Sequence, residues 1–351
     1  MAVNCIVVEV SWRRSFNEGT HCDANTKLKN QLIGSDTGDM VCLQGCRYGS
    51  FRSNIIGSMR FYCTDFSDQE DWTSGESTLV YTFPESSNHF YQFGFTGNAW
   101  IGTIRNGGGN WELRTTASLT IRNDTGKMNS SPKTVMQPII RLQHGCNHTI
   151  TIPDFLKLLH WQEITNRNIN YIYKVSDPDN DDVRCRWATS DRSECGGICN
   201  SFRGAEMHER ECIISYSPNW IGWFAAAVQI EDFNSTESLE ALSSVSLQFL
   251  VVVFQATTKC ASKPTFVEPS RIGGSCIGIP FNTTYFDQIV SRSGSLNVRI
   301  REIQTASPQG MAESRIDLYD EREWYVNISW TPGIGQAGPH LFCFTALDSN
   351  R

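Results

Sequence analysis

The sequence predicts an all-β fold made of tandem β-sandwich modules that are stapled by disulfides. Three observations lead to this prediction: short strand-like runs separated by Gly and Asn, 13 cysteines, and a length of 351 residues. One sandwich needs about 100 residues, so we expect three modules in a chain of this length. Apolar residues make up 40% of the chain and charged residues 19%, which suits packed cores and excludes a disordered polypeptide.

The first module is expected over residues 1–137. Strand-like runs rich in β-branched and aromatic residues recur at 7–12, 59–63, 79–83, 90–95 and 111–122. The Gly-rich stretch 106–110 predicts a hairpin turn, because no lysine follows it to make a phosphate-binding loop. Residues 124–138, rich in Asn, Ser, Lys and Pro, are predicted to be a linker to the next module.

Residues 138–257 are expected to form the second module and residues 258–351 the third. Val183, Cys185 and Trp187 share one face of a run in which two arginines share the other, so this run is predicted to be a half-buried strand. Residues 154–174 break the β pattern with helical spacing, and we treat them as an insertion in the second module.

The cysteines indicate an oxidising compartment, because cytosolic chains with this many thiols normally hold CxxC metal ligands and no CxxC occurs here. The close pairs Cys42/Cys46 and Cys195/Cys199 fit either short-range disulfides or neighbouring bridges. Bridges are expected within single modules, and Cys5 is our candidate for the cysteine left over from an odd total. The cysteines predicted to form disulfides are Cys22, Cys42, Cys46, Cys63, Cys146, Cys185, Cys195, Cys199, Cys212, Cys260, Cys276 and Cys343.

Six Asn-x-Ser/Thr sequons favour secretion when they are taken together with the cysteines. A plain polar turn is the alternative interpretation of each one, since the tripeptide is common by chance. Residues 1–10 lack the basic segment and cleavage site of a signal peptide, so we expect the chain to be a fragment of a longer secreted or cell-surface protein. The predicted glycosylation sites are Asn123, Asn129, Asn147, Asn234, Asn282 and Asn327.

Charge and motif content exclude several classes of function. The net charge is −7 and no Lys/Arg run occurs, so nucleic acid is not an expected partner. The longest apolar run, residues 247–254, is far shorter than the ~20 residues that span a bilayer. No nucleophile elbow, HExxH helix, Walker loop or dinucleotide fingerprint occurs, and we therefore expect no enzyme. Only a glycosidase carboxylate pair, whose spacing depends on the fold, stays open.

An acidic loop at 177–182 is the candidate metal site. Calcium prefers six to eight oxygen ligands, and clustered carboxylates supply them. An EF-hand is excluded, because Asp182 stands where its loop needs Gly and Ala188 stands where it needs Glu. The alternative is a solvated turn in which Asp side chains cap their own backbone. The predicted calcium ligands are Asp177, Asp179, Asp181 and Asp182, with Asp232 as a distant contributor.

Three tryptophans lie among polar residues and are candidate ligand-binding side chains: Trp72, Trp100 and Trp111. Exposed aromatic rings stack on sugars and form binding hot spots, so these residues raise a lectin hypothesis. Packing into a sandwich core is the alternative role.

An aromatic-x-Pro corner occurs twice in the chain. Tyr216-Ser-Pro218 precedes Gly222 and a run that reaches Asp232, and Trp330-Thr-Pro332 precedes Gly338 and a run that reaches Asp348. These corners resemble the closing strand of cadherin-like and related immunoglobulin-like repeats. The loop 177–182 reads Asp-Pro-Asp-Asn-Asp-Asp and is similar to the Asp-Pro-Asp-Gly-Asp loops of such repeats.

The resemblance covers residues 139–351 and extends to multidomain extracellular proteins of invertebrates, mostly without assigned function. It implies tandem sandwich modules at a cell surface. The chain lacks the Asp-Arg-Glu and Asp-x-Asn-Asp-Asn linker motifs of cadherins, which argues against several ions at each module junction.

These observations predict a non-enzymatic adhesion or recognition module of a cell-surface or matrix protein. Its expected partners are other extracellular proteins or glycans, and calcium is the only expected cofactor. A carbohydrate-binding module is the alternative, and a structural spacer is a third interpretation.

Overall fold

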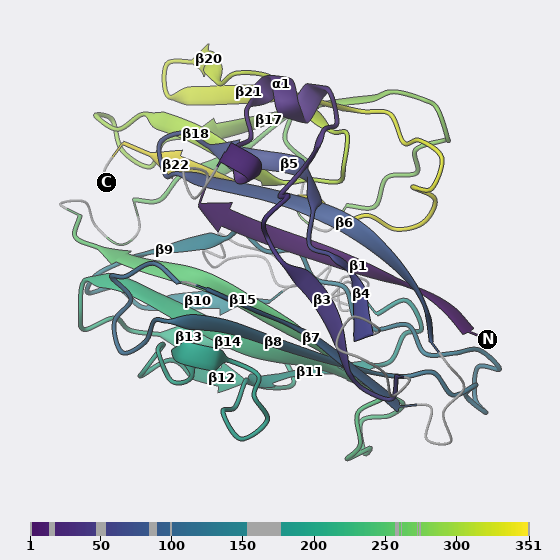
Figure 1. Ribbon diagram of the computed structural model, residues 1–351. Coiled ribbons are helices and arrows are strands. Elements are labelled where there is room, and N and C mark those ends of the chain that lie inside the picture. The colour runs from purple at the N-terminus through teal and green to yellow at the C-terminus, as the bar shows by residue number, and fades with distance from the viewer. Residues whose placement is uncertain are drawn as a thin grey trace.

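The computed structural model is built almost entirely of β-strands, which confirms the predicted fold class (Figure 1). It describes residues 2–13, 18–46, 54–83, 90–98, 100–152, 177–256, 260, 262–271, 273 and 275–349. The predicted insertion at 154–174 lies outside these residues. The described helices are the short elements η1 (Glu18–Thr20), α1 (Ala24–Leu28) and η4 (Gly196–Ile198).

Two sheets enclose the core of the first sandwich. The smaller sheet has the order β1-β6-β5-β2, and its strands are β1 (Ala2–Arg13), β2 (Leu32–Ile33), β5 (Phe61–Ser67) and β6 (Trp72–Phe83). Facing it are β3 (Asp39–Gln44), β4 (Ile55–Ser58), β7 (Phe90–Asn98) and β8 (Asn110–Ser118). Phe61, Phe83, Tyr91 and Phe95 fill the space between them, because alternate residues of each strand point to the same face.

The strands β3, β4, β7 and β8 belong to a larger, eight-stranded sheet that continues into the second sandwich. Its order is β11-β14-β15-β8-β7-β3-β4, and β9 also pairs with β15. The added strands are β9 (Ile139–Gln143), β11 (Asp182–Trp187), β14 (Gly222–Phe233) and β15 (Ser243–Phe254). A three-stranded sheet of β10 (His148–Thr151), β12 (Glu206–His208) and β13 (Ile213–Tyr216) covers them (Figure 1).

The second core confirms the alternation expected for β11. Val183 and Cys185 are buried in this core with Trp187 packed against it, and Cys185 forms a disulfide with Cys212 of the covering layer. The neighbouring strand β14 is buried on both faces. Its Ala225 and Ala227 are small enough to let a loop, closed by the Cys195–Cys199 disulfide, pack on the second face.

The Gly-rich stretch 106–110 is the tip of the turn predicted before β8, and it docks on that disulfide loop. Gly108 donates its backbone N–H to the carbonyl of Gly197 at 2.9 Å. A Cβ added to Gly197 would lie 1.6 Å from the carbonyl oxygen of Gly108, so no larger residue fits there. The glycines therefore allow the two backbones to approach each other closely.

The third sandwich is formed by a five-stranded and a two-stranded sheet. The larger sheet contains β16 (Thr265–Val267), β17 (Tyr285–Arg292), β19 (Ala312–Glu313), β20 (Asp317–Asp320) and β21 (Glu323–Trp330). The smaller sheet pairs β18 (Ile300–Ala306) with β22 (Cys343–Asp348). Ile289, Ile303, Val326 and Trp330 lie in the core between them.

The two aromatic-x-Pro corners have the same role in the second and third sandwiches. Tyr216 ends β13, and after Pro218 the chain crosses to the other sheet and forms β14. Trp330 ends β21, and after Pro332 the chain likewise crosses to the other sheet and forms β22. The internal echo in the sequence therefore corresponds to a repeated crossing between layers.

The connection between the first two sandwiches is tighter than a linker. β15 pairs with β8 over two residues only, but the side chain of Ser246 accepts from the backbone N–H of Arg114 and donates to its carbonyl. Leu250 donates its backbone N–H to Pro138 at 3.0 Å, and Gln137 is buried. The end of the stretch predicted to be a linker, residues 137–138, therefore packs along the sheet, whereas residues 124–127 are exposed.

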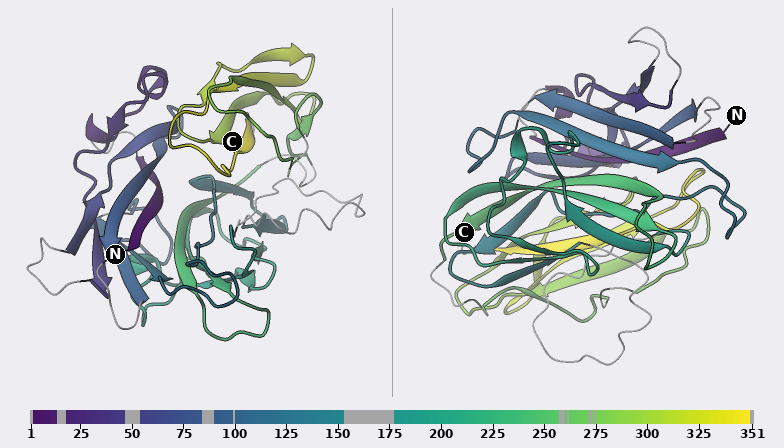
Figure 2. Two further views of the ribbon diagram at one scale, coloured as in Figure 1. Left: turned by 90° about the vertical axis from the view of Figure 1, so that its right-hand side faces the viewer. Right: turned by 90° about the horizontal axis from the view of Figure 1, so that it is seen from below.

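The third sandwich lies beside the first (Figure 2, left), where β18 runs close to β5. Lys27 of α1 lies 3.4 Å from the carboxylate of Asp65 and 3.6 Å from that of Glu313, and all three side chains are largely buried. Glu302 accepts a hydrogen bond from Ser67 at 3.1 Å. Polar and charged groups thus join residues of the first sandwich to the third.

Ten of the twelve predicted cysteines form five disulfides: Cys22–Cys63, Cys42–Cys46, Cys146–Cys260, Cys185–Cys212 and Cys195–Cys199. Both close pairs are short-range bridges. Cys146–Cys260 joins residues on either side of the boundary expected at 257, so the expectation of bridges within modules is wrong there. The five bridges do not include Cys276, which is exposed in a loop, so its predicted pairing is corrected. They also do not include Cys343, which begins β22. The side chain of Cys5 lies outside the described part of the chain.

Among the described residues, no helix has the length and apolar character needed to cross a bilayer.

A candidate metal centre

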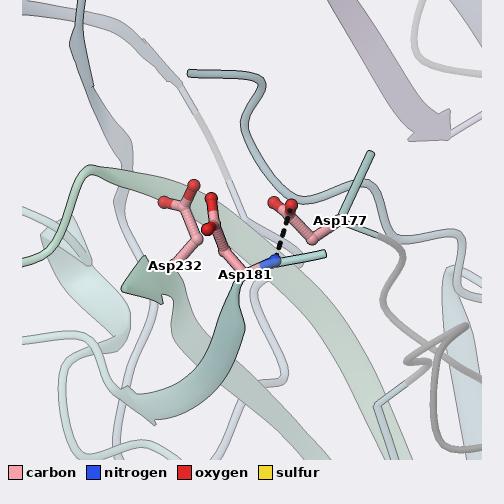
Figure 3. A group of neighbouring side chains, drawn as sticks. All are labelled: Asp177, Asp181 and Asp232. Atoms are coloured by element: carbon pink, nitrogen blue, oxygen red, sulfur yellow. Dashed lines mark hydrogen bonds between the residues drawn. The ribbon is translucent and has the colours of Figure 1, made fainter. Parts of the chain in front are cut away.

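Three of the predicted calcium ligands come together at the end of the large sheet. Asp177, Asp181 and Asp232 each place one carboxylate oxygen within 4.8 Å of the others. Asp177 and Asp181 lie in the loop that leads into β11, and Asp232 lies near the end of β14. Figure 3 shows the three carboxylates side by side, with Asp181 between the other two in this view.

Local backbone structure explains how the loop reaches this position. The Asp177 Oδ1 accepts the backbone N–H of Asp179 at 2.8 Å and that of Asp181 at 3.2 Å, which closes the turn (Figure 3). Asn180 adopts a φ of +68°, a left-handed conformation that Asn tolerates better than most residues. The antiparallel pair Val183/Asp232 then places the start of β11 beside the end of β14.

The other two predicted ligands are used elsewhere. Asp179 accepts the backbone N–H of Ser130 at 2.5 Å through Oδ2. Asp182 forms an ion pair with Arg184 at 2.8 Å. Neither belongs to the group of three, although the sequence places them in the same six-residue run.

The sequence interpretation missed Arg122, which supplies positive charge to the centre. Its guanidinium is largely buried and forms a bidentate ion pair with Asp181, donating to both carboxylate oxygens. It also pairs with Asp124 at 2.7 Å. It also donates to the Oδ1 of Asn129 at 2.7 Å. These bonds raise the pKa of Arg122 above its ordinary value, so it stays protonated. No local pattern predicts this role, since Arg122 lies 59 residues before Asp181.

Asp232 is fully buried, and both of its carboxylate oxygens have donors. Oδ1 accepts from the backbone N–H and the hydroxyl of Ser243 at 2.7 and 2.6 Å, and Oδ2 accepts from the Nδ2 of Asn129 at 2.6 Å. Burial nevertheless raises the pKa of Asp232 to about 6. The side chain thus ties β14 to the start of β15 and to the connection before β9.

Asp177 differs from Asp181 and Asp232 because one of its carboxylate oxygens lacks a hydrogen-bond donor in the described ranges. It is 4% exposed, and its Oδ2 has no hydrogen-bond partner among the residues that the structure describes. Burial raises the pKa of Asp177 to about 7, and the charges of Asp232 and Asp181 add to the effect. A buried carboxylate oxygen without a donor is costly and calls for a cation or a proton.

The six sequon asparagines differ in exposure and in hydrogen bonding. Asn129 is half-buried and donates through Nδ2, the atom that would carry a glycan, to Asp232. A glycan on this atom would displace the bond to Asp232, so the geometry argues against glycosylation at Asn129. The remaining five sequon asparagines are exposed: Asn123, Asn147, Asn234, Asn282 and Asn327.

The tryptophans chosen for a lectin site belong to the interior. Trp72 is 3% exposed and Trp100 is 8% exposed. Trp111 is half-buried and stacks on Trp100 with 4.6 Å between ring centroids. The prediction that these rings are available for sugar stacking is wrong: Trp72 is buried at the start of β6, and Trp100 and Trp111 pack in one cluster with the Cys195–Cys199 loop. Among the described tryptophans, Trp220 is exposed at the surface, with 66% of its area accessible.

Comparison with known families places the first sandwich in context. Residues 3–120 match the family model described as integrin beta-like protein A-E, N-terminal. The match ends close to the end of β8, so it covers the first sandwich together with the turn that docks on the second. No curated protein matches the chain. The match and the five disulfides together indicate an extracellular, adhesion-related β-rich protein.

Proposed function

We propose that this chain is a non-enzymatic adhesion or recognition module of a cell-surface or matrix protein. The observation that carries the proposal is the match of residues 3–120 to the N-terminal part of integrin beta-like proteins, on a scaffold cross-linked by disulfides. Its partners are other extracellular proteins or glycans. The repeated layer crossing supports kinship of the second and third sandwiches with cadherin-like and immunoglobulin-like repeats.

The buried charges support a scaffold role. Arg186 pairs with Glu194 and Glu231 at 2.7 and 2.9 Å and joins β11 to β14 and to the loop that follows β11. Lys27 acts in the same way, because it pairs with Asp65 of the first sandwich and with Glu313 of the third. In each case the charged groups link segments far apart in the sequence, which gives a rigid platform for exposed loops.

A cell-adhesion assay tests the proposal. Plates coated with the purified, oxidised protein should retain cells of the source organism in a saturable way, and soluble protein should compete. The same protein after reduction and alkylation is the matched control and should retain few cells, because the sandwiches depend on their bridges. Retention no greater than on albumin-coated plates would contradict the proposal.

A glycan array separates protein partners from glycan partners. The carbohydrate-binding alternative has lost the three tryptophans on which it was based, so we expect no glycan signal from the native protein. A specific glycan signal would favour the alternative, and a protein that binds neither cells nor glycans would be a structural spacer.

A further inference from the structure

We infer that Asp177, Asp181 and Asp232 bind one calcium ion, which fastens the connection between β8 and β9 to the end of the large sheet. Oxygen atoms of the three carboxylates lie within 4.8 Å of one another, as the ligands of a single ion must. Two of these residues are separated from the third by about 50 positions in the sequence, so the fold itself assembles the group.

The independent observation is the unpartnered oxygen of Asp177. Its Oδ2 is buried and accepts no hydrogen bond within the described part of the chain, while its Oδ1 accepts two. Protein interiors rarely leave a charged acceptor in this state. A cation beside Oδ2 removes the deficit, and the turn that holds Oδ1 keeps the second oxygen directed at the ion.

The excess of negative charge around the three carboxylates also favours a bound cation. Five carboxylates gather here, from Asp124, Asp177, Asp179, Asp181 and Asp232, and the bonds of the group include one guanidinium, that of Arg122. Arg122 pairs with Asp181 and Asp124 and supplies one positive charge against their two negative charges. Asp177 and Asp232 keep uncompensated charge, and a divalent ion supplies two positive charges at that point.

The donor set suits calcium better than zinc or magnesium. All of the ligand atoms are oxygens, whereas structural zinc takes Cys and His. Magnesium demands near-ideal octahedral geometry, and calcium accepts an irregular shell that waters complete. With three carboxylates, the affinity should fall in the range of extracellular calcium modules, with a Kd of about 10⁻⁴–10⁻³ M. Only this comparison with extracellular modules rests on the proposed function.

Binding has a structural consequence for the junction of two sandwiches. Asn129 and Ser130, in the connection before β9, already hold Asp232 and Asp179. An ion on Asp232 and Asp177 would fix both acidic segments relative to this connection. Calcium would therefore make the first and second sandwiches move as one body.

Isothermal titration calorimetry of the purified chain with calcium chloride tests the inference and needs no adhesion partner. We expect one ion per chain and, at tenfold excess over Kd, a rise in Tm of about 2–4 °C. Asp177→Asn should weaken binding at least tenfold. Asp182→Asn is the matched control, since Asp182 lies in the same loop but pairs with Arg184, and its Kd should stay within twofold of the wild type.

Hydrogen exchange of the wild-type chain locates the ion without relying on a variant that folds. Calcium should slow exchange in peptides covering 122–130, 177–182 and 229–243 and leave those covering 285–330 unchanged. Absence of heat and of protection at 10 mM calcium chloride, roughly ten times the upper Kd, would overturn the inference and leave the centre as an ion-pair network. Equal loss of binding in Asp177→Asn and Asp182→Asn would also overturn it. Either failure leaves the adhesion proposal standing.

Discussion

Thr305 donates its backbone N–H to the Oδ2 of Asp65 at 2.7 Å, across 240 residues of sequence. Asp65 lies in β5 of the first sandwich and Thr305 in β18 of the third. Gln309 repeats this pattern by donating its backbone N–H to Glu76 at 2.6 Å. The contact between these sandwiches thus depends on polar groups that are buried and directional, which makes it sensitive to single substitutions.

Lys27→Met should destabilise the chain by about 3–5 kcal/mol, because it leaves the buried carboxylates of Asp65 and Glu313 without their cation. Urea denaturation measures the change. Lys29→Met is the matched control: Lys29 is exposed on the same short helix region, and its substitution should stay within about 0.5 kcal/mol. Equal effects of the two substitutions would show that the buried ion pairs do not stabilise the contact.

Glu313 gives this contact a pH dependence. Burial, followed by the negative charge of Asp65, raises the pKa of Glu313 above that of an ordinary glutamate, while Lys27 opposes the shift. The native state then binds the proton more tightly than the unfolded state, so stability present at low pH is lost as the pH rises through the raised pKa.

Glu313→Gln removes this loss. The free energy of unfolding of this variant, minus that of the wild type, should therefore increase from pH 5 through 6 and 7 to 8 when both are measured by urea denaturation. Parallel pH profiles for the two proteins would contradict the burial of a titrating carboxyl group at this contact.

Trp100→Ala should cost about 3–5 kcal/mol of stability, since the ring is buried against Trp111 in the second face of β14. Trp220→Ala is the control, because that ring is exposed and contacts Arg105 only as a cation–π partner at 5.7 Å. It should cost about 1 kcal/mol or less. A stable Trp100→Ala protein with altered ligand binding would restore the surface role that the sequence suggested.

Asn129 should remain unglycosylated when the chain is secreted, although its sequon is intact. Its Nδ2 donates to Asp232, whereas Asn147 is exposed and accepts a hydrogen bond from Ser217 through Oδ1. Enzymatic deglycosylation in heavy-oxygen water followed by peptide mass mapping distinguishes the sites. Label at Asn129 in the folded protein would mean that the connection before β9 is not held against the large sheet.

The local features of this fold were predictable and its long-range contacts were not. Alternation in β11 and the aromatic-x-Pro corners at Tyr216 and Trp330 reflect strand geometry within a few residues. The contact between β8 and β15 has two paired residues and otherwise uses polar side chains such as Ser246, which leave no periodic signal. Trp100 is buried only because the turn after it docks on a distant disulfide loop.

The long-range contacts of the candidate metal centre were equally hard to predict from the sequence. Acidic density in the sequence identified Asp177, Asp181 and the distant Asp232, and these residues do meet. It could not separate them from Asp179 and Asp182, because the partners of these two side chains, Ser130 and Arg184, are fixed by the folded turn and strand and not by the spacing of the acidic residues. Arg122 lies at the end of the run 111–122 that was predicted to be a strand, and Asn129 lies in the stretch whose composition is typical of a linker.

We propose above all that disulfides formed in an oxidising compartment stabilise these sandwiches outside the cell. Peptide mass mapping of the secreted chain under non-reducing conditions tests it most directly. We predict the pairs Cys22–Cys63, Cys42–Cys46, Cys146–Cys260, Cys185–Cys212 and Cys195–Cys199. Recovery of these ten residues as thiols from the natively folded protein would contradict the account.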